Sequence, residues 1–120
     1  EYTNFCRSKC PTIVSLISDM EKSGDLMTAW VSRLVPGSYI RPHSGFTPKF
    51  IRIHLGIVTD PDCYIVVGDT KRTWEEGKLL AFYDGGPVQH WVKHEGTKER
   101  IIFSVDVTLK YLYPWIKADE

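Results

Sequence analysis

Residues 11–23 form a stretch in which apolar side chains recur at intervals of three and four. This spacing places them on one face of a helix. Pro11 suits the first helical turn, and Gly24 suits the position just past the last one. The pattern therefore predicts one amphipathic helix that covers a side of a sheet. Its apolar stripe is interpreted as core rather than as a cofactor site.

After Gly24 the apolar residues recur at every second position, which is the spacing of strands with one buried face. Turn signals such as Pro36-Gly37 and Gly85-Gly86-Pro87 separate these segments. The expected strands lie near 27–35, 38–42, 49–58, 63–68, 78–83, 88–93 and 100–108. Many short strands at this density predict a mainly β fold, either a sandwich or a small barrel.

Two of the expected strands are apolar on one face and polar on the other. In the segment 50–57 the aliphatic residues alternate with Arg52 and His54, and in 100–107 such residues alternate with a face that begins at Arg100. A polar strand face either is exposed to water or lines a polar pocket. These two faces are therefore the candidates for a functional site.

The composition fits a single domain over residues 1–120. The chain is 42% hydrophobic, and its 15 basic residues balance 15 acidic ones. A net charge near zero gives no reason to expect binding to nucleic acid or to an anionic membrane. No apolar run approaches the ~20 residues of a membrane span. The chain begins Glu-Tyr-Thr without Met, which fits a domain trimmed at its N-terminal side.

The cysteines are Cys6, Cys10 and Cys63. An odd number argues against a full disulfide framework. Cys6 and Cys10 could form a bridge or supply two metal ligands, but no second Cys/His pair has zinc-finger spacing. We expect free thiols, and with them a reducing, cytoplasmic setting.

The four histidines are His43, His54, His90 and His94. Imidazole is the commonest side-chain ligand of transition metals. His43 precedes a strand and His90 lies near the start of another, so these two rings can meet across neighbouring strands. Spacing alone leaves the alternative that they are surface or hydrogen-bonded residues. His94 is expected at the surface.

Each of two histidines is followed by an arginine one strand onward. Arg52 follows His43 by nine residues, and Arg100 follows His90 by ten. The planar donor fork of arginine suits a carboxylate. A pocket with two imidazoles and two guanidiniums would bind a metal ion and a dianionic acid together. The alternative is that both arginines are solvated or paired on a sheet surface.

The motifs of the chain resemble those of the aspartyl/asparaginyl β-hydroxylase family, which belongs to the Fe(II)- and 2-oxoglutarate-dependent oxygenases. The resemblance runs from about residue 4 to 108 and rests on spaced blocks in the right order. These blocks are Cys10-Pro11-Thr12, Ser32-Arg33-Leu34-Val35-Pro36-Gly37, His43-Ser44-Gly45, Arg52-Ile53-His54-Leu55-Gly56, Thr73-Trp74-Glu75-Glu76-Gly77-Lys78, His90, and Arg100 before Ile102-Phe103-Ser104-Val105-Asp106-Val107. The resemblance implies a double-stranded β-helix, that is, a jelly-roll or cupin-like barrel, with the predicted helix packed outside.

The resemblance also implies that His43 and His90 are the two iron ligands and the catalytic residues. Many oxygenases of this superfamily carry a carboxylate two residues after the first histidine. Here that position is Gly45, as it is in the β-hydroxylase family. A vacant position of this kind leaves a chloride ligand open as an alternative, as in related halogenases.

The co-substrate residues follow from the same resemblance. Arg52 and His54 resemble the pair that binds one carboxylate of 2-oxoglutarate, and Ser32 and Arg100 resemble the pair that binds the other. Arg52 and His54 would then point into the barrel, with the isoleucine face packed outward against the helical layer. The loop before His90 is about two residues longer than the usual family spacing and is expected to border the substrate.

The implied function is that of a dioxygenase that uses Fe(II), 2-oxoglutarate and O2 to hydroxylate an Asp or Asn side chain. The expected partner is a protein or peptide substrate, with no nucleic acid and no membrane span in this chain. One alternative is a hydroxylase of a lipid acyl chain or another small molecule. The other is a β-barrel binding module without turnover. Animal relatives act in the secretory pathway, so its lumen is the alternative to the cytoplasm.

Overall fold

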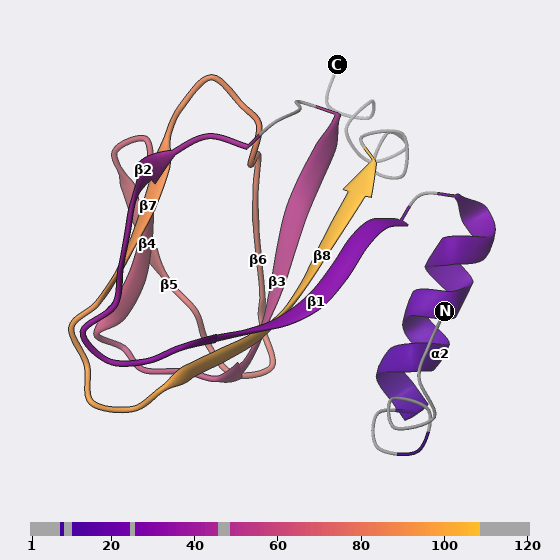
Figure 1. The fold of residues 1–120 in the computed structure, drawn as a ribbon, viewed down its shortest axis with the longest axis horizontal. Helices are drawn as coiled ribbons and strands as arrows, with labels where there is room; N and C mark the ends of the chain where they lie inside the picture. Colours follow the sequence, from indigo (N-terminus) through magenta and orange to yellow (C-terminus); the bar gives the residue numbers. More distant parts are fainter. Residues whose placement is uncertain (1–7, 9–10, 25, 46–48, 109–120) are drawn as a thin grey trace.

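The computed structural model describes residues 8, 11–24, 26–45 and 49–108 (Figure 1). The elements are α2 (Pro11–Ser23), β1 (Leu26–Leu34), β2 (Tyr39–His43), β3 (Phe50–Val58), β4 (Cys63–Val67), β5 (Thr70–Thr73), β6 (Leu79–Phe82), β7 (His90–His94) and β8 (Arg100–Thr108). Cys63 is a buried free thiol. Cys6 and Cys10 lie outside the described residues, so the prediction for them stays a prediction.

Two four-stranded antiparallel sheets face each other (Figure 1). The first sheet has the order β1-β8-β3-β6, and the second has the order β2-β7-β4-β5. The chain passes from one sheet to the other along most of its length, as in a double-stranded β-helix. The predicted fold class is thus confirmed, with one correction. Among the described residues no hydrogen-bonded strand pair joins the two sheets, so they do not close into a barrel.

The predicted strands agree with the observed ones to within two residues, apart from one that was missed. The missed strand is β5, whose sequence TKRT contains no apolar side chain and is exposed throughout. It forms because a turn at Gly68, with φ of 63°, folds the chain back onto β4. A strand held only by backbone pairing leaves no hydrophobic alternation in the sequence.

The predicted helix is confirmed as α2. It begins at Pro11, and Gly24 follows its last residue with φ of 77°, donating its N–H to Glu21 O at 3.0 Å. Glycine reaches this left-handed conformation without a steric penalty. Ile17 is buried, and α2 contacts β1 outside the two sheets (Figure 1). No helix in the described part of the chain has the length and apolar character needed to cross a membrane.

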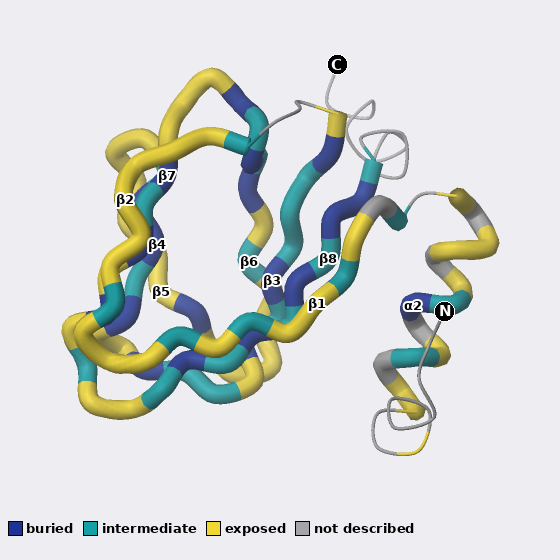
Figure 2. The backbone as a smooth tube through the Cα atoms, viewed as in Figure 1, coloured by how far each residue is buried: buried dark blue, intermediate teal, exposed yellow. Residues whose placement is uncertain are grey.

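The apolar core lies between the sheets. Its buried cluster consists of Cys63, Ile65, Trp74, Phe82, Val92 and Ile102, with Leu34, Val67 and Leu80 packed against it. Burying a large apolar side chain stabilises the fold by about 1.5–3 kcal/mol. Buried residues alternate with partly buried ones along β8 from Arg100 to Asp106, and β3 buries Phe50, His54 and Gly56 on one face, so both strands turn one face inward. Figure 2 shows buried and partly buried stretches along both strands. Polar residues are buried beside this core, and they mark either structural connections or a site.

One buried polar group is structural. Asp60 accepts hydrogen bonds from the backbone N–H groups of Asp62, Thr97 and Lys98, and so joins two loops. His94 is only 2% exposed, and its Nε2 lies 2.7 Å from Lys98 O. The prediction of a surface histidine at position 94 is therefore wrong. The loop that follows β7 folds back over the ring, which no local pattern reveals.

Candidate functional site

The polar faces of β3 and β8 both point into the space between the sheets. The strands pair so that Arg52 lies opposite Asp106 and His54 lies opposite Ser104. His54, Arg100, Ser104 and Asp106 are buried. The sequence predicted that Arg52 and His54 share an inward face, and the structure confirms this. The polar faces of β3 and β8 line the interior and are not exposed to solvent.

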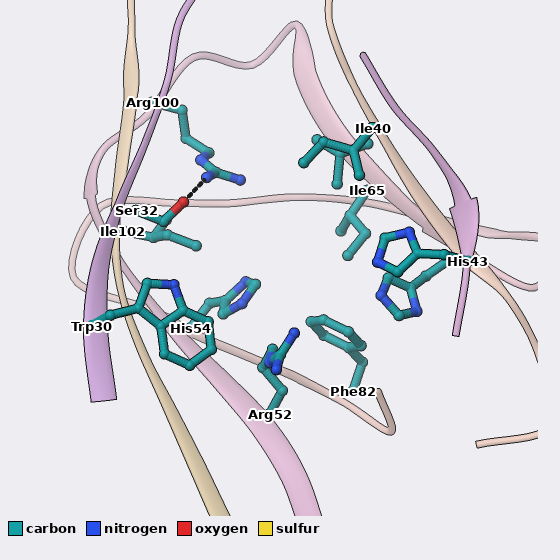
Figure 3. A pocket seen from close by; sticks show the side chains of 12 residues that line it. Trp30, Ser32, Ile40, His43, Arg52, His54, Ile65, Phe82, Arg100 and Ile102 are labelled. Carbon is teal, nitrogen blue, oxygen red and sulfur yellow. Dashed lines mark hydrogen bonds between the residues drawn. The ribbon is translucent and has the colours of Figure 1, made fainter. Parts of the chain in front are cut away.

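A pocket of about 170 Å³ opens between the sheets (Figure 3). The structure brings all of the predicted site residues to it, and these are Ser32, His43, Arg52, His54, His90 and Arg100. The remaining walls are largely apolar and consist of Trp30, Ile40, Ile65, Phe82, Val92 and Ile102. Figure 3 shows Arg100 and Ser32 on one side of the pocket and His43 on the opposite side. The volume suits a small organic acid better than a drug-sized ligand.

His43 and His90 form the imidazole side of the pocket. His43 ends β2, His90 begins β7, and the two residues are partners in the antiparallel ladder. Their ring centroids are 4.3 Å apart, with an interplanar angle of 61°. His43 Nδ1 lies 2.8 Å from Arg41 O, so in the neutral ring Nδ1–H donates and Nε2 keeps its lone pair. The first ring therefore has a nitrogen available to an ion.

His90 has a corresponding arrangement. Its Nε2 lies 3.1 Å from Asp84 Oδ1, while its Nδ1 is buried and finds no hydrogen-bond partner in the described residues. Burial lowers the pKa of His90, as do His43 and Arg52, although Asp84 opposes the shift. A neutral ring that donates Nε2–H to the carboxylate keeps a lone pair on Nδ1. One nitrogen fixed by an oxygen and the other left with a lone pair is typical of histidines that bind metals.

The donor set of the pocket thus fits a divalent transition metal held by two imidazoles. In the residues that the structure describes, no group of three or more His, Cys, Asp and Glu side chains has the geometry of a metal site. Two neutral imidazoles leave most coordination positions of such an ion to other ligands. A metal here would therefore depend on the organic acid as well as on the protein.

Asp84 occupies the space beside Gly45. The Gly45 N–H donates to Asp84 O at 2.8 Å, and a Cβ atom on residue 45 would collide with the Asp84 carboxylate. Position 45 is therefore glycine for a steric reason. The space that a carboxylate at 45 would use already holds a negative group. Like-charge repulsion then argues against the chloride alternative.

The two arginines have different surroundings. All three nitrogens of the Arg52 guanidinium are engaged: Nε and Nη2 donate to Asp106 at 2.8 and 3.1 Å, and Nη1 donates to Asp84 Oδ1 at 2.9 Å. Burial would lower the pKa of Arg52, but the hydrogen bond and charge of Asp106, followed by the charge of Asp84, raise it. The plane of Arg52 also lies 4.8 Å from the Trp30 ring. Arg52 is thus ion-paired with two carboxylates, which engage three of its five N–H groups.

Arg100 has no such carboxylate. It is 3% exposed, donates from Nη2 to Ser32 Oγ at 2.8 Å, and lies 4.5 Å from the Trp74 ring. Its Nε has no hydrogen-bond partner, and none of the ion pairs among the described residues includes it. Burial lowers the pKa of Arg100. A buried guanidinium without a counter-ion is costly unless an anion binds it. Arg100 is therefore the group in the pocket whose chemistry suits an anion.

His54 lies between the two sides and is held as a neutral donor. Trp74 Nε1–H donates to His54 Nδ1 at 3.0 Å, so the neutral ring carries its proton on Nε2. Burial lowers the pKa of His54 to about 3, with contributions from Arg100, Arg52 and His90. Trp74 reaches this position because the segment after β5 is tied to β3 by the Gly77 N–H, which donates to Gly56 O at 2.9 Å.

Three residues of this network were not predicted to have a role at the site. Asp106 could have been found, because it shares the inward parity of Arg100 on β8 and lies opposite Arg52. Trp74 and Asp84 lie on connections between strands, where no periodicity applies. Asp84 in a Gly-rich loop is indistinguishable from an exposed turn residue in the sequence, yet it is 3% exposed.

Comparison with known proteins decides the family. A family model described as aspartyl/asparaginyl beta-hydroxylase matches residues 2–109. The chain belongs to the aspartyl/asparaginyl β-hydroxylase family. It is 37% identical over 108 residues to mouse aspartate beta-hydroxylase domain-containing protein 2, which covers 85% of this chain and 31% of that protein. It is 40% identical over 80 residues to human aspartyl/asparaginyl beta-hydroxylase, which covers 66% of this chain and 10% of that protein. The chain thus spans less than a third of the length of these relatives.

Solved structures agree on the fold of this family member. A predicted oxalate decarboxylase from Thermotoga maritima superposes with a TM-score of 0.58 at 12% identity, covering 75% of this chain and 73% of that chain. The cupin domain of Schizosaccharomyces pombe Cnp3 has a TM-score of 0.54 at 11% identity, covering 74% of this chain and 61% of that chain. At these identities the likeness concerns the cupin-like fold alone.

Proposed function

We propose that the chain is the oxygenase domain of an Fe(II)- and 2-oxoglutarate-dependent hydroxylase that acts on an Asp or Asn side chain of a protein or peptide. The observation that carries this proposal is the pairing of His43 with His90 across one pocket from the unpaired guanidinium of Arg100. Membership of the aspartyl/asparaginyl β-hydroxylase family supports hydroxylation as the reaction. The name of the human relative supports the substrate class.

His43 and His90 would hold the metal through the ring nitrogens that keep their lone pairs. Arg41 O fixes the orientation of the first ring, and Asp84 fixes that of the second. When bound, iron with 2-oxoglutarate and dioxygen would supply the chemistry that inserts an oxygen atom into a C–H bond and converts the co-substrate to succinate and carbon dioxide. The apolar walls of the pocket exclude water from this space, which protects the reaction from side reactions.

Arg100 and Ser32 would bind the carboxylate of 2-oxoglutarate that lies farther from the metal. A charge-assisted bond to a buried guanidinium is strong because little water competes for it. Neutral His54 would donate its Nε2–H to the same co-substrate without adding a charge. These groups fix the position of the organic acid before reaction.

The substrate side chain would approach from the open side of the pocket. Trp30 and Ile40 line the pocket and are each 37% exposed, so they offer apolar surface at its entrance. The loop that contains Asp84 leads into His90 and borders the imidazole side. A peptide that inserts one side chain needs only such an entrance, because the rest of it stays outside.

The test combines binding with turnover. Anaerobic addition of Fe(II) and then 2-oxoglutarate to the purified chain should give a weak visible charge-transfer band, which His43→Ala should lack. In air, succinate should form faster in the presence of a peptide that contains Asp or Asn, and the peptide should gain the mass of one oxygen atom. Absence of the band in the unmodified chain would support the alternative of a binding module without turnover. Stimulation by an acyl lipid and not by peptides would support the small-molecule alternative.

A further inference from the structure

The segment 74–78 joins β5 to β6 and is bound through its backbone to a single residue of β3. The Gly56 N–H donates to Lys78 O at 3.1 Å, and Gly56 O accepts a hydrogen bond from the Gly77 N–H at 2.9 Å. The approach is so close that a Cβ atom on residue 56 would lie 2.3 Å from Glu75 O. Position 56 is therefore glycine because a larger residue would push this segment away from the sheet.

This contact places Trp74 beside the preceding inward residue of β3. His54 and Gly56 are two residues apart, so both lie on the face of β3 that points into the interior. Trp74 is 3% exposed, and its Nε1–H donates to His54 Nδ1 at 3.0 Å. Its ring also lies 4.5 Å from the guanidinium carbon of Arg100. Because Trp74 is not among the residues that line the pocket, it can affect a bound molecule only through the residues that it holds.

We propose that the segment 74–78 is a positioning element of the pocket, in which Trp74 holds the proton of His54 on Nε2 so that this nitrogen donates to the organic acid. The part played by the acid rests on the proposed function, whereas the position of the proton does not. The proposal gives a role to the motif Thr73-Trp74-Glu75-Glu76-Gly77-Lys78, none of whose residues lines the pocket.

The charges near His54 oppose this position of the proton. Burial lowers the pKa of His54, and so do the nearby charges of Arg100 and Arg52, which line the same pocket. Guanidinium groups are donors only, so they favour a lone pair on the ring nitrogen that faces the pocket. That tautomer would turn a lone pair toward a carboxylate and repel it. The Trp74 N–H reverses the preference, because a donor aimed at Nδ1 requires the lone pair to be there.

The experiment reads the proton position and the acid affinity separately. Long-range proton–nitrogen NMR spectra of the isotope-labelled chain, without metal or acid, show which ring nitrogen of each histidine carries the proton. The variant His54→Ala identifies the signals of His54. The test variants are Trp74→Phe, which keeps a ring beside Arg100 but removes the N–H, and Gly56→Ala, which displaces the whole segment.

Two controls match these variants. Trp91→Phe removes an indole N–H from a side chain that packs against Tyr39 and Tyr64 and does not line the pocket. Lys78→Ala removes an exposed side chain of the same segment but keeps the backbone oxygen that binds Gly56. Neither control should change either readout.

We expect His54 to carry its proton on Nε2 in the unmodified chain, and to show a substantial fraction of the Nδ1–H form in Trp74→Phe and in Gly56→Ala. Affinity for 2-oxoglutarate is measured by calorimetry with Zn(II), which has no redox chemistry. It should fall about tenfold in Trp74→Phe, as for the loss of one hydrogen bond to a charged group. In a His54→Ala background Trp74→Phe should cause no further loss, since Trp74 acts through His54.

The inference is overturned if Trp74→Phe leaves the proton of His54 on Nε2 alone. It is also overturned if the proton moves but the affinity for 2-oxoglutarate does not change, or if the loss of affinity persists in the His54→Ala background. If Gly56→Ala does not fold, Trp74→Phe decides the matter by itself. Failure of the proposed function would look different, because the unmodified chain would then bind no 2-oxoglutarate while the NMR result stayed the same.

Discussion

Strand β8 belongs to the first sheet and β4 to the second, and both turn side chains into the space between the sheets. The inward residues of β8 are Arg100, Ile102, Ser104 and Asp106, whereas the buried residues of β4 are the apolar Cys63, Ile65 and Val66. The first sheet therefore contributes charged groups and donors to the pocket. The second contributes apolar surface, together with the two imidazoles where β2 ends and β7 begins.

This difference assigns the two halves of the proposed chemistry to different sheets. Buried charges are tolerated only when they are paired or hydrogen-bonded. On the first sheet Asp106 is paired with Arg52, whereas among the described residues Arg100 contacts Ser32 and an aromatic ring but no carboxylate. On the second sheet His43 and His90 lie side by side, and burial lowers the pKa of His90. The fold brings the proposed metal ligands and the proposed anion-binding arginine together by packing the two sheets face to face.

Removing an imidazole from the second sheet should have the largest effect. His43→Ala or His90→Ala deletes one of the two proposed metal ligands, so we expect loss of Fe(II) binding and of turnover. Metal titration and succinate formation measure the two losses. Undiminished succinate production by both variants would refute the assignment of these ligands. It would also refute the assignment of metal binding to the second sheet and anion binding to the first.

The second-largest effect is expected from removing the Arg100 guanidinium from the first sheet. Arg100→Ala deletes the guanidinium that we propose binds the co-substrate, and we expect it to cost about 2–5 kcal/mol in 2-oxoglutarate binding. Fe(II) or Co(II) affinity without the acid should change much less. Calorimetry with each ligand separates the two, and an unchanged dissociation constant for 2-oxoglutarate would count against the assignment of Arg100.

The neutral histidine of the first sheet should make stability depend on pH. The pKa of His54 is about 3 in the folded chain and about 6.5 in an unfolded one. The unfolded state therefore binds more protons between these values, and the free energy of unfolding falls as the pH is lowered through this window. The His54 contribution lost from pH 7 to pH 5 is about 2 kcal/mol. Urea unfolding across this range measures it.

The variant His54→Gln serves as the control for this effect, because its amide oxygen can still accept the Trp74 hydrogen bond. Its stability should depend less steeply on pH than that of the unmodified chain. Some slope should remain, since the pKa of His90 is also lowered by burial. Identical slopes in the two proteins would mean that His54 is not held neutral by the fold.

The smallest effect is expected from the hydroxyl that supports Arg100. Ser32→Ala removes one hydrogen bond to the guanidinium, so 2-oxoglutarate binding should weaken by about 1 kcal/mol, or roughly fivefold. The dissociation constant of 2-oxoglutarate is the measurement, with Ser32→Thr as the control that keeps a hydroxyl. A loss as large as that of Arg100→Ala would show that the Ser32 hydroxyl contributes as much to 2-oxoglutarate binding as the guanidinium, and would contradict its supporting role.

Much of this molecule could be predicted from the sequence because the relevant signals are local. A spacing of three and four gave α2, and alternation gave the strands and the inward direction of Arg52 and His54. Alternation fixes the face of a side chain, since successive residues of a strand point to opposite sides. The family motifs then selected six side chains that the fold brings to one pocket.

Only the tertiary structure decided which groups those side chains meet. Arg52 and Arg100 look alike in the sequence, but Arg52 is paired with Asp84 and Asp106, whereas Arg100 has no carboxylate partner in the part of the chain that the structure describes. The burial of His94 and the pairing of β5 likewise depend on segments that approach from elsewhere in the chain. Hydrogen bonds and ion pairs form over a few ångströms in space, whatever the separation in sequence. The charge state and availability of a site residue are therefore properties of the packed chain.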